Sequence, residues 1–161
     1  MTDWLGHFGF SYMGLIYLLL LFIPNLLWAK HPPAGYRSGG ENRVLLVLER
    51  AGEALTTAAA LLFSDFNPGP LTPWSLWLAA SLLLMLLYEL YWLRYFRGPH
   101  SLEDFYRPFL GVPVPGASLP VAAFLLLGIY GRVIGMLLAA LVLGVGHIGV
   151  HLQHWRELRE R

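Results

Sequence analysis

The chain alternates between long apolar stretches and short segments rich in proline, glycine and charge. A transmembrane helix needs about 20 predominantly apolar residues. The pattern predicts five such spans, at about residues 8–29, 44–64, 74–96, 110–130 and 133–155. The sequence therefore predicts an all-α fold, a polytopic integral membrane helical bundle that forms a single transmembrane domain over residues 1–161.

Glycine and proline interrupt the fourth predicted span. Residues 119–130 alone would form a helix of about 18 Å, which is shorter than the ~30 Å hydrocarbon core. The span must then include the segment 111–118, GVPVPGAS, and we expect regular helix only from about Ser118. Irregular backbone is tolerated at membrane depth only where protein or a wet cavity covers it. Before this span, Ser101 followed by an acid at position 104 predicts a short interfacial helix.

Composition supports a membrane location. The chain is 57% hydrophobic and 13% charged, with a mean hydropathy of +0.56, whereas soluble domains are about 45–50% apolar and about 25% charged. The absence of cysteine excludes disulfides and thiolate metal ligands. The chain has no basic face interleaved with aromatic residues, which is the pattern that would predict a nucleic-acid partner. The expected partners are membrane lipids.

The basic residues predict the orientation in the membrane. Lysine and arginine gather in the loop 30–43, around the connection 94–107 and in the tail 156–161, while the opposite side carries only Arg132. The positive-inside rule then places the N-terminus outside and the C-terminus in the cytoplasm. We expect a multi-pass protein of the cell membrane.

Three histidines form a stripe near the end of the last span. His147, His151 and His154 are spaced i, i+4, i+7, so they fall within an arc of about 60°. Ala140 and Gly144 lie on the same arc, where small side chains allow a close helix approach. Histidines at membrane depth turn away from lipid. We expect His147 and His151 to be buried and His154 to be solvated at the interface.

Acidic residues also occur inside predicted spans. Glu49 and Glu53 lie one turn apart on the second span, and Glu89 lies in the third. Facing lipid would cost several kcal/mol, so these groups must face protein or water. An ion-pair network of the two glutamates with Arg50 and Arg43 is the alternative. The polar groups expected to converge in a cavity on the cytoplasmic side are Asn25, Glu49, Glu53, Glu89, Arg94, His147 and His151.

The Glu/His set permits three kinds of chemistry. Two imidazoles at i, i+4, such as His147 and His151, could hold Zn, Fe or Mn with a glutamate completing the ligand shell. Without a metal, Glu53 or Glu89 would act as general base, with Glu49, His147 and His151 as further catalytic candidates. A purely structural role in packing is the third interpretation. The HxxxH spacing also occurs in membrane-bound histidine-box hydroxylases, but those carry several boxes and this chain has one.

Further residues are candidates for binding a substrate headgroup at the mouth of the cavity. Arg94 and Arg107 could clamp an anionic head, with Tyr106 beside them and Asn25 deeper in the bundle. Ordinary anchoring of basic residues at the membrane surface is the alternative.

These observations predict a small integral membrane protein with a buried Glu/His site that opens to the cytoplasm. The favoured function is an enzyme that acts on a lipid-like or isoprenoid-like substrate by acid–base or metal-assisted chemistry. An oligomeric cation or proton carrier or channel subunit, or an assembly partner for another membrane protein, is the alternative. The outline is similar to that of small membrane methyltransferases and sterol-isomerase-like bundles, although the motif residues of neither are present.

Overall fold

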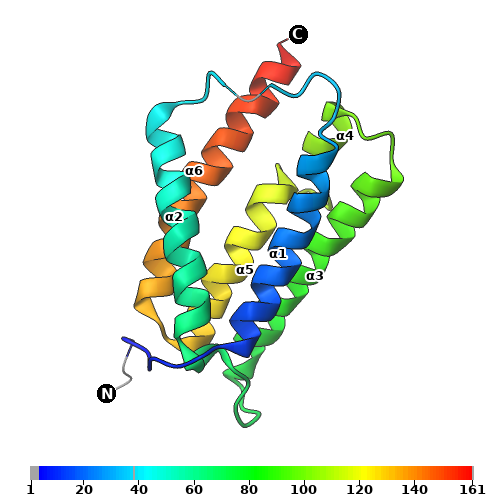
Figure 1. The fold of residues 1–161 in the computed structure, drawn as a ribbon. Coiled ribbons are helices and arrows are strands. Elements are labelled where there is room, and N and C mark those ends of the chain that lie inside the picture. Colours follow the sequence, from blue (N-terminus) through cyan, green and yellow to red (C-terminus); the bar gives the residue numbers. More distant parts are fainter. Residues whose placement is uncertain (1–3, 38, 161) are drawn as a thin grey trace.

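The fold is a bundle of helices that run the length of the molecule (Figure 1). The computed structural model describes residues 4–37 and 39–160. Within these residues the chain is all-α, with six α-helices and one short 3-10 helix. Their bounds are α1 Tyr12–Lys30, α2 Arg43–Leu62, η1 Ser64–Phe66, α3 Ser75–Arg97, α4 Leu102–Tyr106, α5 Pro115–Gly131 and α6 Ile134–Arg159.

Three of the helices, α1, α3 and α6, are long and apolar enough to cross a membrane. This finding indicates a multi-pass membrane protein and supports the prediction of five spans in part. The other two predicted spans correspond to α5, an apolar helix of 17 residues, and α2, a helix of 20 residues that carries charges at Glu49, Arg50 and Glu53. At 1.5 Å per residue these helices would be about 26 Å and about 30 Å long. Whether they cross the membrane stays a prediction.

The fourth apolar segment becomes helical earlier than the sequence predicts. Helix α5 begins at Pro115 rather than near Ser118. Proline is well suited to the first turn of a helix because it has no amide that needs a partner and its φ is already helical. Val114 precedes it with a positive φ of 40°, which turns the chain into the helix. The irregular segment therefore ends before the helix begins, and α5 continues through Pro120.

Helices α2 and α6 pack with their backbones in direct contact. A Cβ atom added at Gly146 would overlap the backbone of Glu49, and one added at Gly52 would overlap the backbone of Leu143. The small-residue stripe expected at Ala140 and Gly144 serves a different neighbour, because a Cβ at Gly144 would contact Val121 of α5. Helix α5 in turn lies between α6 and α3.

Helix α1 comes very close to α2 near its first turn. A Cβ at Gly14 would overlap the carbonyl of Ala60, which marks the crossing point. From there the two helices diverge toward the end of the bundle where α1 finishes and α2 begins (Figure 1). Helix α1 stays in contact with α3 along this length, since Tyr17 donates to Ser81 at 2.9 Å and, two turns later, Asn25 donates to Tyr88 at 2.7 Å.

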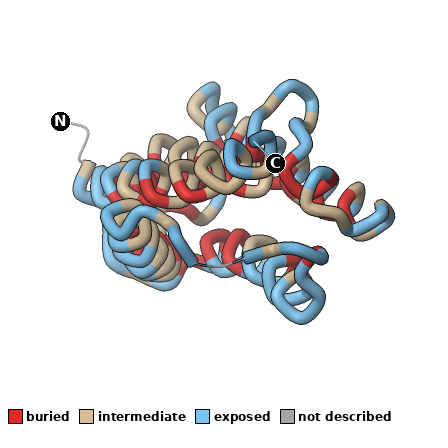
Figure 2. The backbone as a smooth tube through the Cα atoms, turned by 90° about the horizontal axis from the view of Figure 1, so that it is seen from above, coloured by how far each residue is buried: buried red, intermediate tan, exposed pale blue. Residues whose placement is uncertain are grey.

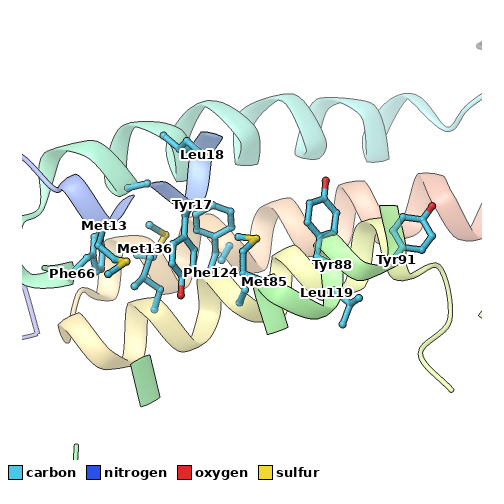
Figure 3. Packing of buried hydrophobic residues seen from close by; sticks show 14 of the residues in the cluster. Met13, Tyr17, Leu18, Phe66, Met85, Tyr88, Tyr91, Leu119, Phe124 and Met136 are labelled. Atoms are coloured by element: carbon cyan, nitrogen blue, oxygen red, sulfur yellow. The ribbon is translucent and has the colours of Figure 1, made fainter. Parts of the chain in front are cut away.

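The backbone of buried residues lies along the inside of the bundle, and that of exposed residues along its outside (Figure 2). Figure 3 shows the apolar core at the α1 N-terminal end, where Met13, Tyr17, Phe66, Phe124 and Met136 lie together. Burial of these apolar side chains is the main contribution that stabilises the packing of the helices against one another. The opposite end of the bundle carries the polar groups described below.

The connection between α3 and α5 contains the predicted interfacial helix. Ser101 caps α4, and its hydroxyl accepts the amide of Asp104 at 3.1 Å. The N-cap expected from the sequence is thus confirmed. Phe105 of α4 is buried among aromatic rings of α3, including Trp92 and Tyr95. This packing holds α4 against the end of the bundle.

Candidate functional site

Two carboxylates of α2 and one imidazole of α6 form a cluster. His147 Nδ1 lies 2.6 Å from Glu49 Oε1. Glu53 stands one turn further along α2, and one ligand atom from each of the three residues lies within 4.8 Å of the others. The glycine contacts between α2 and α6 explain the arrangement, since they bring the two helix faces close enough for short side chains to meet.

A cavity of about 190 Å³ adjoins this cluster between α1, α2, α5 and α6. Most of its wall is apolar, contributed by side chains of α1, α5 and α6. The polar residues that line it are Asn25, Glu53, Thr56, Thr57 and His147. Glu49 lies behind this wall and reaches the cavity through His147. The cavity thus combines an apolar wall with a small polar region.

Two polar side chains in the wall of the cavity, Asn25 and Thr56, differ in whether they have hydrogen-bond partners. The amide nitrogen of Asn25 donates to the carbonyl of Leu21 and to the hydroxyl of Tyr88, each at 2.7 Å. The side-chain hydroxyl of Thr56 is buried, and no hydrogen-bond partner reaches it from the described residues. A buried polar group without a partner costs about 1–3 kcal/mol, so this hydroxyl is a candidate contact for a ligand.

An arginine side chain lies beside the cluster and forms an ion pair with one of its carboxylates. Arg50 Nη1 lies 3.3 Å from Glu53 Oε2, and the arginine side chain is 78% exposed. The alternative interpretation of an ion-pair network therefore accounts for part of the cluster. Glu49 is not in this ion pair and has only His147 as its hydrogen-bond partner among the described residues. The Glu49–His147 pair is thus separate from the exposed pair.

Glu89 does not join the cluster. Its side chain lies on α3 beside the apolar residues Ile23, Pro24 and Leu27 of α1, in a separate shallow groove. One carboxylate oxygen is buried, and no described residue donates to it. Its role as a base stays a prediction, since it lies apart from the other candidates.

The residues considered for headgroup binding serve the connection between α3 and α5. Arg94 donates to the backbone carbonyls of Asp104, Arg107 and Pro108, and it lies over the ring of Tyr91. Arg107 is ion-paired to Asp104 at 3.2 Å. Tyr106 is only 3% exposed. These contacts give each group a structural partner, and headgroup binding stays a prediction.

The other two histidines of the stripe have different surroundings. The ring of His151 lies 4.5 Å from that of His147; it packs at a tilt against Phe105 and edge-on against Tyr106, both of α4. Among the described residues, the group of close metal-ligand atoms contains His147 with the two glutamates and leaves out His151. The pairing of His147 with His151 as metal ligands stays a prediction, and the close group of donors joins one imidazole nitrogen with two carboxylates.

His154 is not solvated, contrary to the expectation from its interfacial position. Its side chain is 11% exposed, and its Nε2 lies 3.1 Å from Glu41 Oε1. The reason is that residues 39–42 cross over α6, where Gln153 donates to the carbonyl of Gly40 and accepts the amide of Asn42. Neither Glu41 nor Gln153 stands out in the sequence, because nothing in the helical periodicity shows where a long loop will lie.

We expect the loop 31–42 to loosen at acidic pH. The backbone amide of Gly39 donates to Glu41 at 2.8 Å and lowers the pKa of this carboxyl below its usual 4.5, with His154 adding to the effect. A carboxyl whose pKa is lower in the folded state stabilises that state when the pH is above the usual pKa of the carboxyl. This stabilisation is lost as the pH falls through the pKa of the folded state. Hydrogen exchange of the loop amides, corrected for the intrinsic rate, should show falling protection as the pH drops from about 7 to about 3.

In Glu41→Gln, the loop amides should show at every pH the weak hydrogen-exchange protection that the unaltered protein shows at low pH. The exposed Glu103 on α4 supplies the control, since Glu103→Gln should leave the profile unchanged. Tyr36 belongs to this loop, and burial together with the charges of Glu41 and Glu49 raises its pKa, so it stays neutral in this range. Equal protection across the pH range in the unaltered protein would exclude Glu41 as the titrating group.

Comparisons with known proteins add no family to this picture: a scan of protein-family models and searches of curated proteins and of solved structures returned no significant match. The chemistry of the site is therefore inferred from its atoms. A carboxylate that holds an imidazole can orient it for proton transfer. Two carboxylates with one imidazole can also bind a divalent cation.

Proposed function

We propose that the protein is a membrane-embedded enzyme that acts on a lipid-like substrate by acid–base chemistry. The observation that carries this proposal is the cavity in which Glu53 and His147 stand at the edge of an apolar wall. Binding sites for small molecules combine such apolar walls with a few fixed polar groups. The apolar chain of the substrate would contact α1 and α5, and its head would meet the Glu/His cluster.

The roles of the cluster follow from its hydrogen bonds. Glu49 holds one ring nitrogen of His147, which fixes the orientation of the imidazole. His147 would then exchange a proton with the head of the substrate, with Glu53 as the second acid–base group. The free hydroxyl of Thr56 and the carboxylate of Glu53 favour a head that can donate hydrogen bonds, such as a hydroxyl or an amine.

The size of the cavity limits how much of the substrate it can enclose. Pockets for drug-sized ligands measure about 300–1,000 Å³, whereas this cavity measures about 190 Å³. Only the head and the first part of a chain would fit inside. The remainder would lie in the bilayer, leaving between α1 and α2 where these helices diverge. Exposed apolar side chains of α1 on this route, such as Phe22, suit a lipid environment.

A cation or proton carrier is less well supported by the same geometry. A carrier needs polar groups along its whole path through the membrane. Between the cluster and the opposite end of the bundle lies the apolar core around Tyr17, Phe124 and Met136 (Figure 3). The orientation with the C-terminus in the cytoplasm and the occurrence of a homo-oligomer stay predictions.

Photo-crosslinking tests the proposal. The protein would be reconstituted in lipid nanodiscs with a long-chain alcohol that carries a diazirine near the hydroxyl, and labelled peptides would be mapped by mass spectrometry. We expect labels on residues that line the cavity, in particular Phe22, Val121 and Phe124. Uniform labelling over all exposed apolar faces would contradict a lipid site.

Turnover provides the second measurement. The protein would be incubated with lipid extracts of its native membrane, and products would be identified by mass spectrometry. Removal of an acid–base group slows a reaction by about 10²–10⁴-fold, so Glu53→Gln and His147→Gln should each lose turnover to this extent. The exposed Glu103 again provides the control, and Glu103→Gln should retain full activity. Equal turnover in all variants would exclude the cluster as the active site.

A further inference from the structure

The Glu49, Glu53 and His147 cluster offers a donor set that matches a divalent metal ion better than a simple ion pair. Carboxylate oxygens with one imidazole nitrogen form the mixed shell that suits Zn, Fe or Mn. One such atom from each residue lies within 4.8 Å of the other two, so a single ion between them needs only small side-chain adjustments. The three side chains are 12%, 45% and 23% exposed in the order given.

An independent observation at the same place points to a ligand. Thr56 follows Glu53 by one turn on α2, is 2% exposed and lines the same cavity as Glu53 and His147. Its hydroxyl has no hydrogen-bond partner within the described chain. Such a group is satisfied when a metal-bound water, or the metal itself, lies beside it. A hydroxyl in this position is not explained by the contact between α2 and α6 alone.

The helix contacts give the three donors a fixed separation. Gly52 and Gly146 bring the backbones of α2 and α6 together on either side of the cluster, and a larger residue at either position would move them apart. A metal site depends on such support, because ligands must be held near the required geometry before the ion arrives.

We propose that Glu49, Glu53 and His147 bind one divalent transition-metal ion, with open coordination positions that face the cavity. This inference deepens the proposed function and rests on the same cluster: with the ion bound, Glu53 and His147 would be its ligands, and a metal-bound water would exchange the proton with the head of the substrate. The ion would displace the proton shared between His147 and Glu49, because an imidazole coordinates metals in its neutral form. Three protein ligands and an open position are typical of catalytic rather than structural sites. Arg50, which is exposed, would remain at the outer side of Glu53.

Metal titration in detergent tests this inference without any lipid substrate. Untagged protein, treated with a chelator and then freed of it, would be titrated with Zn²⁺, Mn²⁺ and Co²⁺ by calorimetry, and Co²⁺ would also be followed by its visible absorption. We expect one ion per chain. Glu49→Gln, Glu53→Gln and His147→Gln should each weaken binding by at least about tenfold, as loss of even outer-shell partners typically does.

Matched controls separate this donor set from others nearby. His151→Gln removes the neighbouring imidazole, and Glu89→Gln removes a carboxylate of α3 that lies apart from the cluster. Both should bind the ion as the unaltered protein does. The melting temperature of the unaltered protein should also rise with metal. The ligand variants should each show a cooperative melting transition, which shows that they fold, at a temperature that metal does not change.

The inference would be overturned if the unaltered protein bound less than one ion per chain, or if the ligand variants bound the ion as well as the unaltered protein does. Loss of binding in His151→Gln would overturn the proposed donor set. Failure here is distinguishable from failure of the proposed function, because the photo-crosslinking is repeated in the presence of chelator. Labels in the cavity without metal binding leave the lipid site standing, whereas metal binding without such labels supports the metal site alone.

Discussion

Alanine in place of Gly146 is expected to be among the most damaging small substitutions in this protein. The added Cβ would overlap the backbone of Glu49 and approach the carbonyl oxygen of Leu45 at 2.7 Å. Backbone atoms cannot rotate away as the end of a flexible side chain can, so α2 must move away from α6. Overpacking of this kind costs about 1–3 kcal/mol, and here we expect the upper part of that range.

The same substitution elsewhere on α6 should have the opposite effect. A Cβ at Gly135 would meet nothing within 4 Å. Gly135→Ala should therefore stabilise the helix by up to about 1 kcal/mol, because alanine has the higher helix propensity. Unfolding of both variants in detergent, followed by circular dichroism against denaturant, measures the difference. Similar stability for Gly146→Ala and Gly135→Ala would show that the helices can separate at little cost.

Gly146→Ala should also weaken the candidate site. Glu49 and His147 belong to different helices and are 98 positions apart in the chain, so the distance between them depends on how closely α2 approaches α6. Photo-crosslinking in the cavity and metal binding should both decrease in this variant. A variant that loses stability but keeps both kinds of binding would show that the cluster forms without the close backbone contact.

The long apolar helices were the most predictable part of the fold. The apolar blocks that predict the first, third and fifth spans correspond to α1, α3 and α6, because a length of about 20 apolar residues is a local property of the chain. The N-cap at Ser101 was predictable for the same reason, since Ser101 and Asp104 are neighbours in one turn. The start of α5 at Pro115 was missed because proline marks both helix starts and loops.

The candidate site was predictable only in part. Helical periodicity places Glu49 with Glu53 and His147 with His151, each pair on one face of its own helix. It does not show which faces meet. Glu89 was expected in the cluster because its depth in the membrane matches, but depth does not determine direction around the helix, and Glu89 lies beside α1. The close approach at Gly146 was signalled only by a costly glycine within a long helix.

Loss of the Arg94 guanidinium is the second change expected to have a large effect. Its two terminal nitrogens donate to the carbonyls of Asp104, Arg107 and Pro108, which lie in the connection between α3 and α5. Hydrogen bonds from a charged group contribute about 1.5–3 kcal/mol, so Arg94→Met should destabilise the protein by about 3 kcal/mol. Methionine keeps most of the apolar stem, which restricts the change to the lost donors.

Arg97 provides the matched control, since it lies one turn later on α3 and is exposed. Arg97→Met should change stability by less than about 0.5 kcal/mol. Unfolding in detergent gives the two values, and hydrogen exchange of residues 98–114 shows whether the loss is local. Equal effects of the two substitutions would mean that Arg94 contributes only general positive charge at the membrane surface.

The location of the Arg94 contacts connects this prediction to the site. Helix α4 supplies Phe105 and Tyr106, whose rings pack against His151. When the connection loosens, these rings should move away and water should reach His151 and then His147. Arg94→Met should therefore change the chemical environment of both histidines in NMR spectra, although it contacts neither. Unchanged histidine signals in a destabilised Arg94→Met protein would show that α4 covers the site without help from this arginine.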